Sequence, residues 1–220
     1  MIACCLFDLD GVIVDTARYH YLAWASLARE LGFEFTPEAG EATKGVSRMA
    51  SLDIVLHAGG LDDRFSPAEK ERLAAEKNAR YLAYVSAMTP AEVLPGAAAF
   101  LRDVRAHGVL TVLGSASKNA GTILDRCGLR PLFDAVVDGN EVSRAKPDPE
   151  VFLKGAAAVD AAPSVCVVFE DAAAGIEAAS RAGMRSVGVG GGASLSAATM
   201  RLETFAGFTF EQLAMKIDRD

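Results

Sequence analysis

Four short apolar runs, each bounded by turn residues, constrain the fold of this 220-residue chain more than any other feature. They read IACCLF at 2–7, VLTVLG at 109–114, VCVVF at 165–169 and SVGVG at 186–190. Their apolar residues are nearly continuous rather than alternating, which is typical of strands buried on both faces. The sequence therefore predicts a parallel sheet that is covered by helices on both sides.

Helical patterns lie between the later apolar runs. Residues 97–107, 119–127 and 172–182 each end just before a glycine, which is the residue expected after the C-terminus of a helix. This alternation of strand and helix is typical of a doubly wound, Rossmann-like α/β core. We therefore expect an α/β fold built on a parallel sheet.

The interval 15–90 interrupts this rhythm, because it contains helical patterns and no convincing strand. The apolar residues between Tyr19 and Leu31 trace one face of a helix. A capping box, SPAE at 66–69, opens another helix. We predict a helical cap, or lid, at 15–90, inserted after the first strand of a catalytic core made of 1–14 and 91–220.

Composition excludes several classes of function. With 51% hydrophobic and 23% charged residues the chain can bury a full core, and its net charge of -7 gives no basic footprint for nucleic acid. No stretch approaches the roughly 20 apolar residues of a membrane span, and the first apolar run has no signal-peptide pattern. The four cysteines lack CxxC spacing, which favours reduced core residues. We expect a cytoplasmic monomer that binds neither nucleic acid nor membrane.

Two carboxylates, Asp8 and Asp10, follow directly on the first apolar run in the sequence FDLDG. Residues two apart in an extended strand point to the same side, and ligands bind at the carboxyl ends of strands in open α/β sheets. Taken alone, the pair has a structural alternative, in which the acids end the strand and bond turn amides. The residues after the other strands favour a site.

Polar side chains also follow the second and third apolar runs. The second leads into SASKN at 115–119, whose hydroxyls and amides at a predicted helix start suit a phosphate. An ordinary serine N-cap is the structural alternative there. The third run leads into Glu170 and Asp171, adjacent acids that favour a cation over simple helix caps. With Lys146 in the segment KPDP, these groups suit Mg²⁺-dependent phosphoryl transfer to an aspartate.

These residues resemble a known family. FDLDGV at 7–12, Ser115, KP at 146–147 and ED at 170–171 resemble, in order and spacing, the four signature motifs of the haloacid dehalogenase-like phosphotransferases, over nearly the whole chain. Within that superfamily the chain resembles the β-phosphoglucomutase branch. The stretches that carry this second resemblance are DTARYH at 15–20, KGVSR at 44–48, SASKN at 115–119 and the ED pair.

The resemblance implies a Mg²⁺-dependent phosphomutase that interconverts β-glucose 1-phosphate and glucose 6-phosphate. Asp8 is the implied nucleophile, which becomes an aspartyl phosphate, and Asp10 is the implied general acid and base. The implied ligands of Mg²⁺ are Asp8, the carbonyl of Asp10, Asp171 and Glu170. The partner that this activity requires is a small sugar phosphate.

Further residues are implied to bind the substrate or to close the lid. Ser115 and Lys146 would hold the transferring phosphoryl group, and Arg48 the far phosphate of a bisphosphate intermediate, because its fork grips phosphate bidentately. Thr16 and His20, four apart on one helix face, would couple closure to the second aspartate. The other implied phosphate- or substrate-binding residues are Ala116, Ser117, Lys118, Asn119, Lys44, Gly45, Val46, Ser47, Lys77 and Trp24.

Some of these residues have structural alternatives, and so does the activity. Thr16 has the alternative of a helix cap, His20 of a surface histidine, Trp24 of core packing and Lys77 of a solvated charge. A sugar-phosphate phosphatase on the same fold would use the same acids and Mg²⁺, so only the lid separates it from a mutase. A non-catalytic sensor of sugar phosphates would use the pocket for binding alone.

Overall fold

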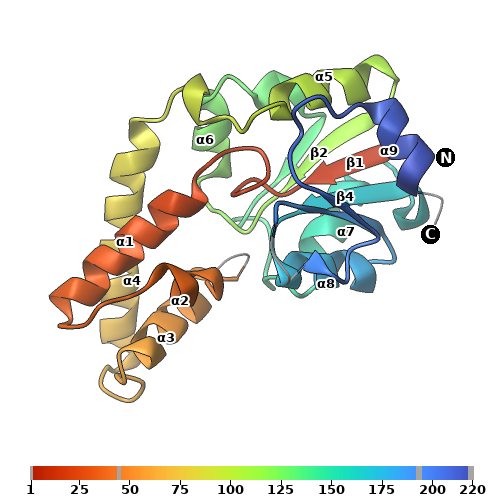
Figure 1. Ribbon diagram of the computed structural model, residues 1–220. Coiled ribbons are helices and arrows are strands. Elements are labelled where there is room, and N and C mark those ends of the chain that lie inside the picture. Colours follow the sequence, from red (N-terminus) through yellow and green to blue (C-terminus); the bar gives the residue numbers. More distant parts are fainter. Residues whose placement is uncertain (1, 44–45, 192–194, 218–220) are drawn as a thin grey trace.

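A computed structural model describes residues 2–43, 46–191 and 195–217 of the chain (Figure 1). Within these residues six parallel strands form one sheet, in the order β3-β2-β1-β4-β5-β6. The strands are β1 (Cys4–Phe7), β2 (Leu110–Gly114), β3 (Ala135–Val137), β4 (Cys166–Glu170), β5 (Arg185–Val189) and β6 (Met200–Leu202). The strand order reverses at β1, which makes this a doubly wound sheet. The predicted fold class is confirmed.

Helices cover both faces of the sheet (Figure 1). The described helices are α1 (Ala17–Glu30), α2 (Pro37–Glu41), α3 (Arg48–Ala58), α4 (Pro67–Ser86), α5 (Ala97–Ala106), α6 (Ala120–Arg126), α7 (Glu150–Ala157), α8 (Ala173–Arg181) and α9 (Phe210–Ile217), with 3-10 turns at Pro90–Glu92, Arg130–Leu132 and Pro163–Val165. Helices α5, α6 and α9 pack on one face, and α7 and α8 on the other. No described helix has the length and apolarity needed to cross a lipid bilayer.

Successive residues of the central strands point to opposite faces of the sheet and pack into two separate hydrophobic cores. Phe7 packs on the side of α5, α6 and α9, where its ring stacks on Phe169 with centroids 4.7 Å apart. Leu6 and Val168 pack on the other side, against α7 and α8. Because both faces are buried, the alternation of apolar and polar residues disappears, and this explains the continuous apolar runs of the sequence.

The two edge strands are absent from the sequence prediction. Each of β3 and β6 is three residues long, lies at one end of the strand order and is partly exposed. Neither can therefore present the buried apolar run by which the four central strands are found. Their absence from the prediction follows from their position in the sheet.

Helices α1 to α4 form an insertion between β1 and α5, as predicted. The insertion has a hydrophobic core of its own, around Trp24, Leu52 and Leu73. The end of α4 instead contributes Tyr81 and Val85 to the core beside the sheet. The division of the chain at residues 14 and 90 into a core and a movable lid stays a prediction.

Candidate active site

The carboxyl ends of the three central strands bring the predicted polar residues together. Asp8 follows β1, Ser115 follows β2, and Asp171 follows β4. Because β1 pairs with both β2 and β4, the three strand ends are adjacent. This edge lies where the strand order reverses, which is the position of ligand sites in doubly wound sheets.

Three carboxylates form a compact cluster at this edge. Among the described residues, Asp8, Glu170 and Asp171 each offer an oxygen that lies within 4.8 Å of the other two. Two glycines give the acids room, since a Cβ on Gly11 would lie 2.2 Å from Asp171 Oδ2 and one on Gly175 would lie 1.9 Å from Glu170 Cδ. Hard oxygen ligands so close together suit a divalent cation such as Mg²⁺. The donor set therefore fits the cation that the resemblance implies.

Lys146 links two of these acids. Its ammonium donates to Asp8 Oδ1 at 2.6 Å, to Glu170 Oε1 at 2.5 Å and to the Gly114 carbonyl at 3.2 Å, and the residue is only 3% exposed. Burial disfavours its charge, but the carboxylates of Asp8 and Glu170 outweigh burial and hold the pKa of Lys146 above its ordinary value. Burial raises the pKa of Glu170. A fixed cation thus lies directly beside Asp8.

The loop after β2 holds the predicted phosphate-binding hydroxyls. Ser115 is buried, and its hydroxyl accepts a hydrogen bond from the Ser117 amide at 3.1 Å. The N-cap position of α6 belongs to Asn119, so the alternative of a serine N-cap for this helix is wrong. Gly139, in the segment after β3, lets this segment approach the loop closely, because a Cβ on Gly139 would lie 2.3 Å from the carbonyl oxygen of Ala116. The loop after β2 therefore packs directly on the segment after β3.

Asp10 has different surroundings from Asp8. The Thr16 hydroxyl donates to Asp10 Oδ1, and His20 Nε2 lies 3.9 Å from Asp10 Oδ2. Thr16 occupies the N-cap position of α1 but its side chain makes no capping bond, so it serves Asp10 instead. Burial raises the pKa of Asp10 to about 6, and the charge of Asp8 adds to this effect. A carboxyl group that titrates near neutral pH can both accept and return a proton.

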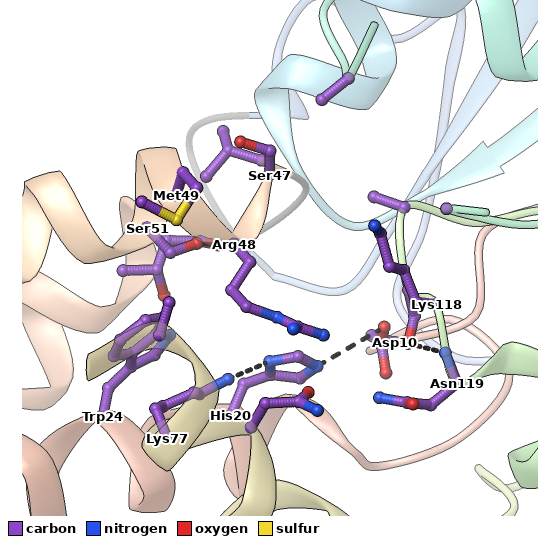
Figure 2. A pocket seen from close by; sticks show the side chains of 18 of the residues that line it. Asp10, His20, Trp24, Ser47, Arg48, Met49, Ser51, Lys77, Lys118 and Asn119 are labelled. Carbon is purple, nitrogen blue, oxygen red and sulfur yellow. Dashed lines mark hydrogen bonds and ion pairs between the residues drawn. The ribbon is translucent and has the colours of Figure 1, made fainter. Parts of the chain in front are cut away.

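Lys77 reaches Asp10 through His20 (Figure 2). The Lys77 ammonium lies 2.9 Å from His20 Nδ1 and 4.5 Å from the ring centroid of Trp24. Burial lowers the pKa of Lys77 to about 7 and also lowers the pKa of His20, and the charge of Arg48 adds to both effects. A neutral His20 that accepts at Nδ1 carries its proton on Nε2, the nitrogen that faces Asp10. Lys77 is buried, so the alternative of a solvated charge is wrong, and Trp24 serves both core packing and this contact.

Asp8, Asp10, His20 and Lys77 line one cavity of about 730 Å³. This volume is within the range of small-molecule sites. Figure 2 shows Arg48 extending above His20 toward Asp10, with Lys118 and Asn119 facing it from the segment after β2. The predicted residues that line the cavity are Asp8, Asp10, His20, Trp24, Val46, Ser47, Arg48, Lys77, Ala116, Ser117, Lys118 and Asn119. Thr16, Ser115, Lys146 and Glu170 are buried. Lys44 and Gly45 lie outside the described residues.

The structure adds residues that the sequence does not point to. Ser51 and Asn78 line the cavity, and the ring of Tyr81 packs on His20 with centroids 4.0 Å apart. Tyr81 and Lys77 are four residues apart on α4, so helical spacing alone places them on one face. No local pattern links α4 to His20, which precedes Lys77 by 57 positions.

Comparison with known proteins agrees with this geometry. A family model of haloacid dehalogenase-like hydrolases matches residues 2–183. The chain belongs to this family. A haloacid dehalogenase-like relative, the β-phosphoglucomutase of Bacillus subtilis (strain 168), is 40% identical over 208 residues, which are 94% of this chain and 92% of the relative.

Two further comparisons bear on activity within the haloacid dehalogenase-like family. The crystal structure of a β-phosphoglucomutase from Clostridium difficile matches with a TM-score of 0.93 at 40% identity, over 99% of this chain and 98% of that chain. The fructose-1-phosphate phosphatase of Escherichia coli (strain K12) is 36% identical over 191 residues, which are 84% of this chain and 94% of the relative. Both mutases and phosphatases therefore occur among the relatives of this chain.

Replacing Gly11 by alanine tests whether the close approach of Asp171 matters for cation binding. Gly11 has φ +84°, and an added Cβ would also collide with the Asp171 carboxylate. We expect Gly11→Ala to lower the free energy of unfolding by about 1 kcal/mol or more. We also expect it to weaken Mg²⁺ binding about 10-fold or more, as measured by titration calorimetry.

Gly108→Ala is the matched control for this substitution. Gly108 has φ +72°, but among the described residues no atom beyond its two chain neighbours lies within 4 Å of its added Cβ. This variant should therefore lose stability and keep its affinity for Mg²⁺. Equal Mg²⁺ affinity in the two variants would show that the contact with Asp171 does not shape the cation site.

Proposed function

We propose that this protein is a Mg²⁺-dependent β-phosphoglucomutase. It interconverts β-D-glucose 1-phosphate and glucose 6-phosphate through an aspartyl phosphate and a β-glucose 1,6-bisphosphate intermediate. The observation that carries the proposal is one cavity that contains two acids in different surroundings, Asp8 and Asp10, together with cations from the helical insertion. The 40% identity to two β-phosphoglucomutases supports the proposal.

Asp8 is the proposed nucleophile. Its Oδ1 is held by Lys146, which orients the carboxylate at the end of β1. Attack by the carboxylate on phosphorus forms the aspartyl phosphate and breaks the bond between phosphorus and the donor oxygen. Lys146 and the Ser115 hydroxyl would hold the phosphoryl oxygens, and the charge of Lys146 favours the transition state. Mg²⁺, held by the acidic cluster and the carbonyl of Asp10, would offset the negative charge that accumulates there.

Asp10 is the proposed acid and base. When the 6-hydroxyl of the sugar attacks the aspartyl phosphate, Asp10 takes the hydroxyl proton and Asp8 leaves as a carboxylate. When the 1-phosphate of the bisphosphate returns to Asp8, Asp10 gives the proton back to the departing 1-oxygen. A pKa of about 6 suits both directions, because neither form of the carboxyl group is strongly favoured near neutral pH.

Arg48 is the proposed clamp for the second phosphate. Ser47 caps α3 by accepting from the Ala50 amide at 3.2 Å, which places Arg48 in the first turn. Among the described residues Arg48 has no ion-pair partner, and it lies close enough to lower the pKa of the buried Lys77. Neighbouring cations without a carboxylate partner favour an anionic ligand. Closure of the predicted lid over this ligand would exclude water from the aspartyl phosphate.

Removal of the Arg48 guanidinium should separate binding of the second phosphate from the first chemical step. We expect Arg48→Ala to lower kcat/KM for β-glucose 1-phosphate about 10- to 100-fold, the loss expected for a hydrogen bond to a charged group. Labelling of Asp8 by acetyl phosphate should keep its wild-type rate, because that donor has no second phosphate. Arg72→Ala is the control, since Arg72 is an exposed arginine of the same insertion. Equal loss of turnover and labelling would count against this role.

A sugar-phosphate phosphatase is the second candidate, and the 36% identity to a fructose-1-phosphate phosphatase favours it. In that activity water, rather than a sugar hydroxyl, would attack the aspartyl phosphate. Both candidates need Asp8, Asp10 and Mg²⁺. The fate of the phosphoryl group therefore distinguishes them.

An assay with three substrates tests the proposed function. Purified protein with Mg²⁺ and a trace of glucose 1,6-bisphosphate receives β-glucose 1-phosphate, its α anomer or fructose 1-phosphate. Glucose 6-phosphate is followed with glucose-6-phosphate dehydrogenase, and inorganic phosphate is measured in parallel. The proposal requires conversion of the β anomer alone into glucose 6-phosphate. Release of phosphate from fructose 1-phosphate without isomerisation of the β anomer would establish the phosphatase instead.

A further inference from the structure

Tyr81 on α4 carries a buried hydroxyl with no role in the mechanism above. The residue is 0% exposed, and its hydroxyl has no hydrogen-bond partner among the described residues. Its ring packs against two members of the site, with the His20 ring centroid 4.0 Å and the Lys77 ammonium 5.0 Å from the centroid of the Tyr81 ring. Buried hydroxyls are normally hydrogen-bonded, so a donor left without a partner beside a ligand cavity needs an explanation.

Asp10, Thr16 and Ser117 lie close enough to this hydroxyl to shift its pKa. Burial raises the pKa of Tyr81, the charge of Asp10 raises it further, and the hydroxyls of Ser117 and Thr16 lower it. The phenol therefore keeps its proton and can only donate to a carboxylate. The Asp10 carboxylate is the strongest acceptor among these neighbours.

Asp10 has room for such a bond. Its Oδ1 accepts from Thr16, and its Oδ2 lies 3.9 Å from His20 Nε2, which is longer than a hydrogen bond. A carboxylate has about four acceptor sites, so a further donor can be accommodated. Thr16 and His20 both approach from the start of α1, whereas Tyr81 approaches from α4. A bond from Tyr81 would hold the carboxylate from a second direction.

We propose that Tyr81 is a positioning residue for Asp10, and that its hydroxyl donates to the Asp10 carboxylate when Asp10 exchanges a proton with the sugar. This role rests on the proposed mutase function and adds a group from α4 to it. The bond would form as the phenol and the carboxylate move together. It would be strong, because O–H···O⁻ bonds are short and charge-assisted. It would also give the Tyr81 hydroxyl the partner that it lacks within the described part of the chain.

The role predicts that only one of two phosphoryl transfers depends on Tyr81. In transfer to the sugar, the hydroxyl oxygen bonds to phosphorus, the bond from phosphorus to Asp8 breaks, and the hydroxyl proton goes to Asp10. In labelling by acetyl phosphate, Asp8 bonds to phosphorus and acetate leaves as a stable anion. The second reaction moves no proton, so the position of Asp10 has no influence on it.

Tyr81→Phe tests the inference, because it removes the hydroxyl and keeps the ring. We expect kcat for β-glucose 1-phosphate to fall about 10- to 100-fold, as for loss of a hydrogen bond to a charged group, with little change in KM. Labelling by acetyl phosphate should keep its wild-type rate. The thermal midpoint should stay the same or rise, because the buried hydroxyl has no partner to lose among the residues that the structure describes. Tyr84→Phe is the control, since Tyr84 lies on the same helix and is exposed.

Each outcome of this experiment decides the inference. A selective loss of kcat in Tyr81→Phe, with Tyr84→Phe and the wild type alike, supports it. Equal kcat in the wild type and Tyr81→Phe overturns the role of Tyr81 and leaves the mutase intact. A parallel loss of kcat, labelling and thermal midpoint shows a structural role instead. If the wild type itself isomerises no sugar phosphate, the proposed function fails first, and the role of Tyr81 fails with it.

Discussion

Asp8→Asn should abolish turnover and leave no phosphorylated protein. Asparagine is not a nucleophile toward phosphorus, so no aspartyl phosphate can form, and we expect kcat to fall about 10⁴-fold or more. The substitution also removes one of the two carboxylates that bond the buried Lys146, although Glu170 stays in place at 2.5 Å. Lys146 therefore keeps a charged partner, and the variant should fold. Mass spectrometry after incubation with acetyl phosphate measures the label directly.

The control for Asp8→Asn is Asp125→Asn, which makes the same change at an exposed aspartate on α6. Asp125 pairs with Arg130 at the surface. It should keep both turnover and label. Binding of β-glucose 1-phosphate by the Asp8→Asn variant separates a further alternative, because a non-catalytic sensor would need no nucleophile. Residual isomerisation by Asp8→Asn at more than a hundredth of the wild-type rate would show that another residue carries the phosphoryl group.

Asp10→Asn should slow phosphoryl transfer from Asp8 to the sugar without slowing the phosphorylation of Asp8 by acetyl phosphate. Asparagine cannot accept the proton of the sugar hydroxyl, and we expect kcat to fall about 10²- to 10⁴-fold, the range for loss of a general base. Labelling of Asp8 by acetyl phosphate should persist, because acetate needs no proton to leave. The labelled protein should therefore accumulate in the variant, whereas in the wild type β-glucose 1-phosphate discharges it. Loss of labelling and turnover in equal measure would contradict the assignment of Asp10.

The pH dependence of kcat/KM gives a second test of Asp10. Burial raises its pKa to about 6, so the ionised form that accepts a proton dominates only above that value. For the phosphorylated enzyme, kcat/KM should rise as the pH increases through about 6. The phosphate of the substrate also titrates near pH 6. The profile of Asp10→Asn, which retains only that second titration, allows the contribution of Asp10 to be isolated.

The core of the site could be predicted from the sequence because its residues follow strands. Asp8, Ser115 and Glu170 come at the ends of apolar runs, and in a parallel sheet those ends meet at one edge. Strand pairing thus converts a position along the chain into a position in space. The glycine after Asp10 also has a structural reason, because a side chain at Gly11 would collide with the Asp171 carboxylate.

The groups around Asp10 could not be predicted in the same way. Lys77 and Tyr81 lie on α4, and they meet His20 only because α1 and α4 pack against each other in the insertion. Helical spacing shows which residues share a face, but it does not show which helix that face meets. The local sequence around Lys77 does not show whether its side chain is solvated or buried; the structure shows that it is buried.

A phosphorus NMR time course tests the central claim most directly. Purified protein is incubated with Mg²⁺ and β-glucose 1-phosphate, after priming with a trace of glucose 1,6-bisphosphate, and all phosphorus species are followed together. A mutase that transfers the phosphoryl group to a sugar and excludes water should convert the signal of β-glucose 1-phosphate into that of glucose 6-phosphate, with little inorganic phosphate. Inorganic phosphate as the main product, with glucose 6-phosphate absent throughout, would contradict the account.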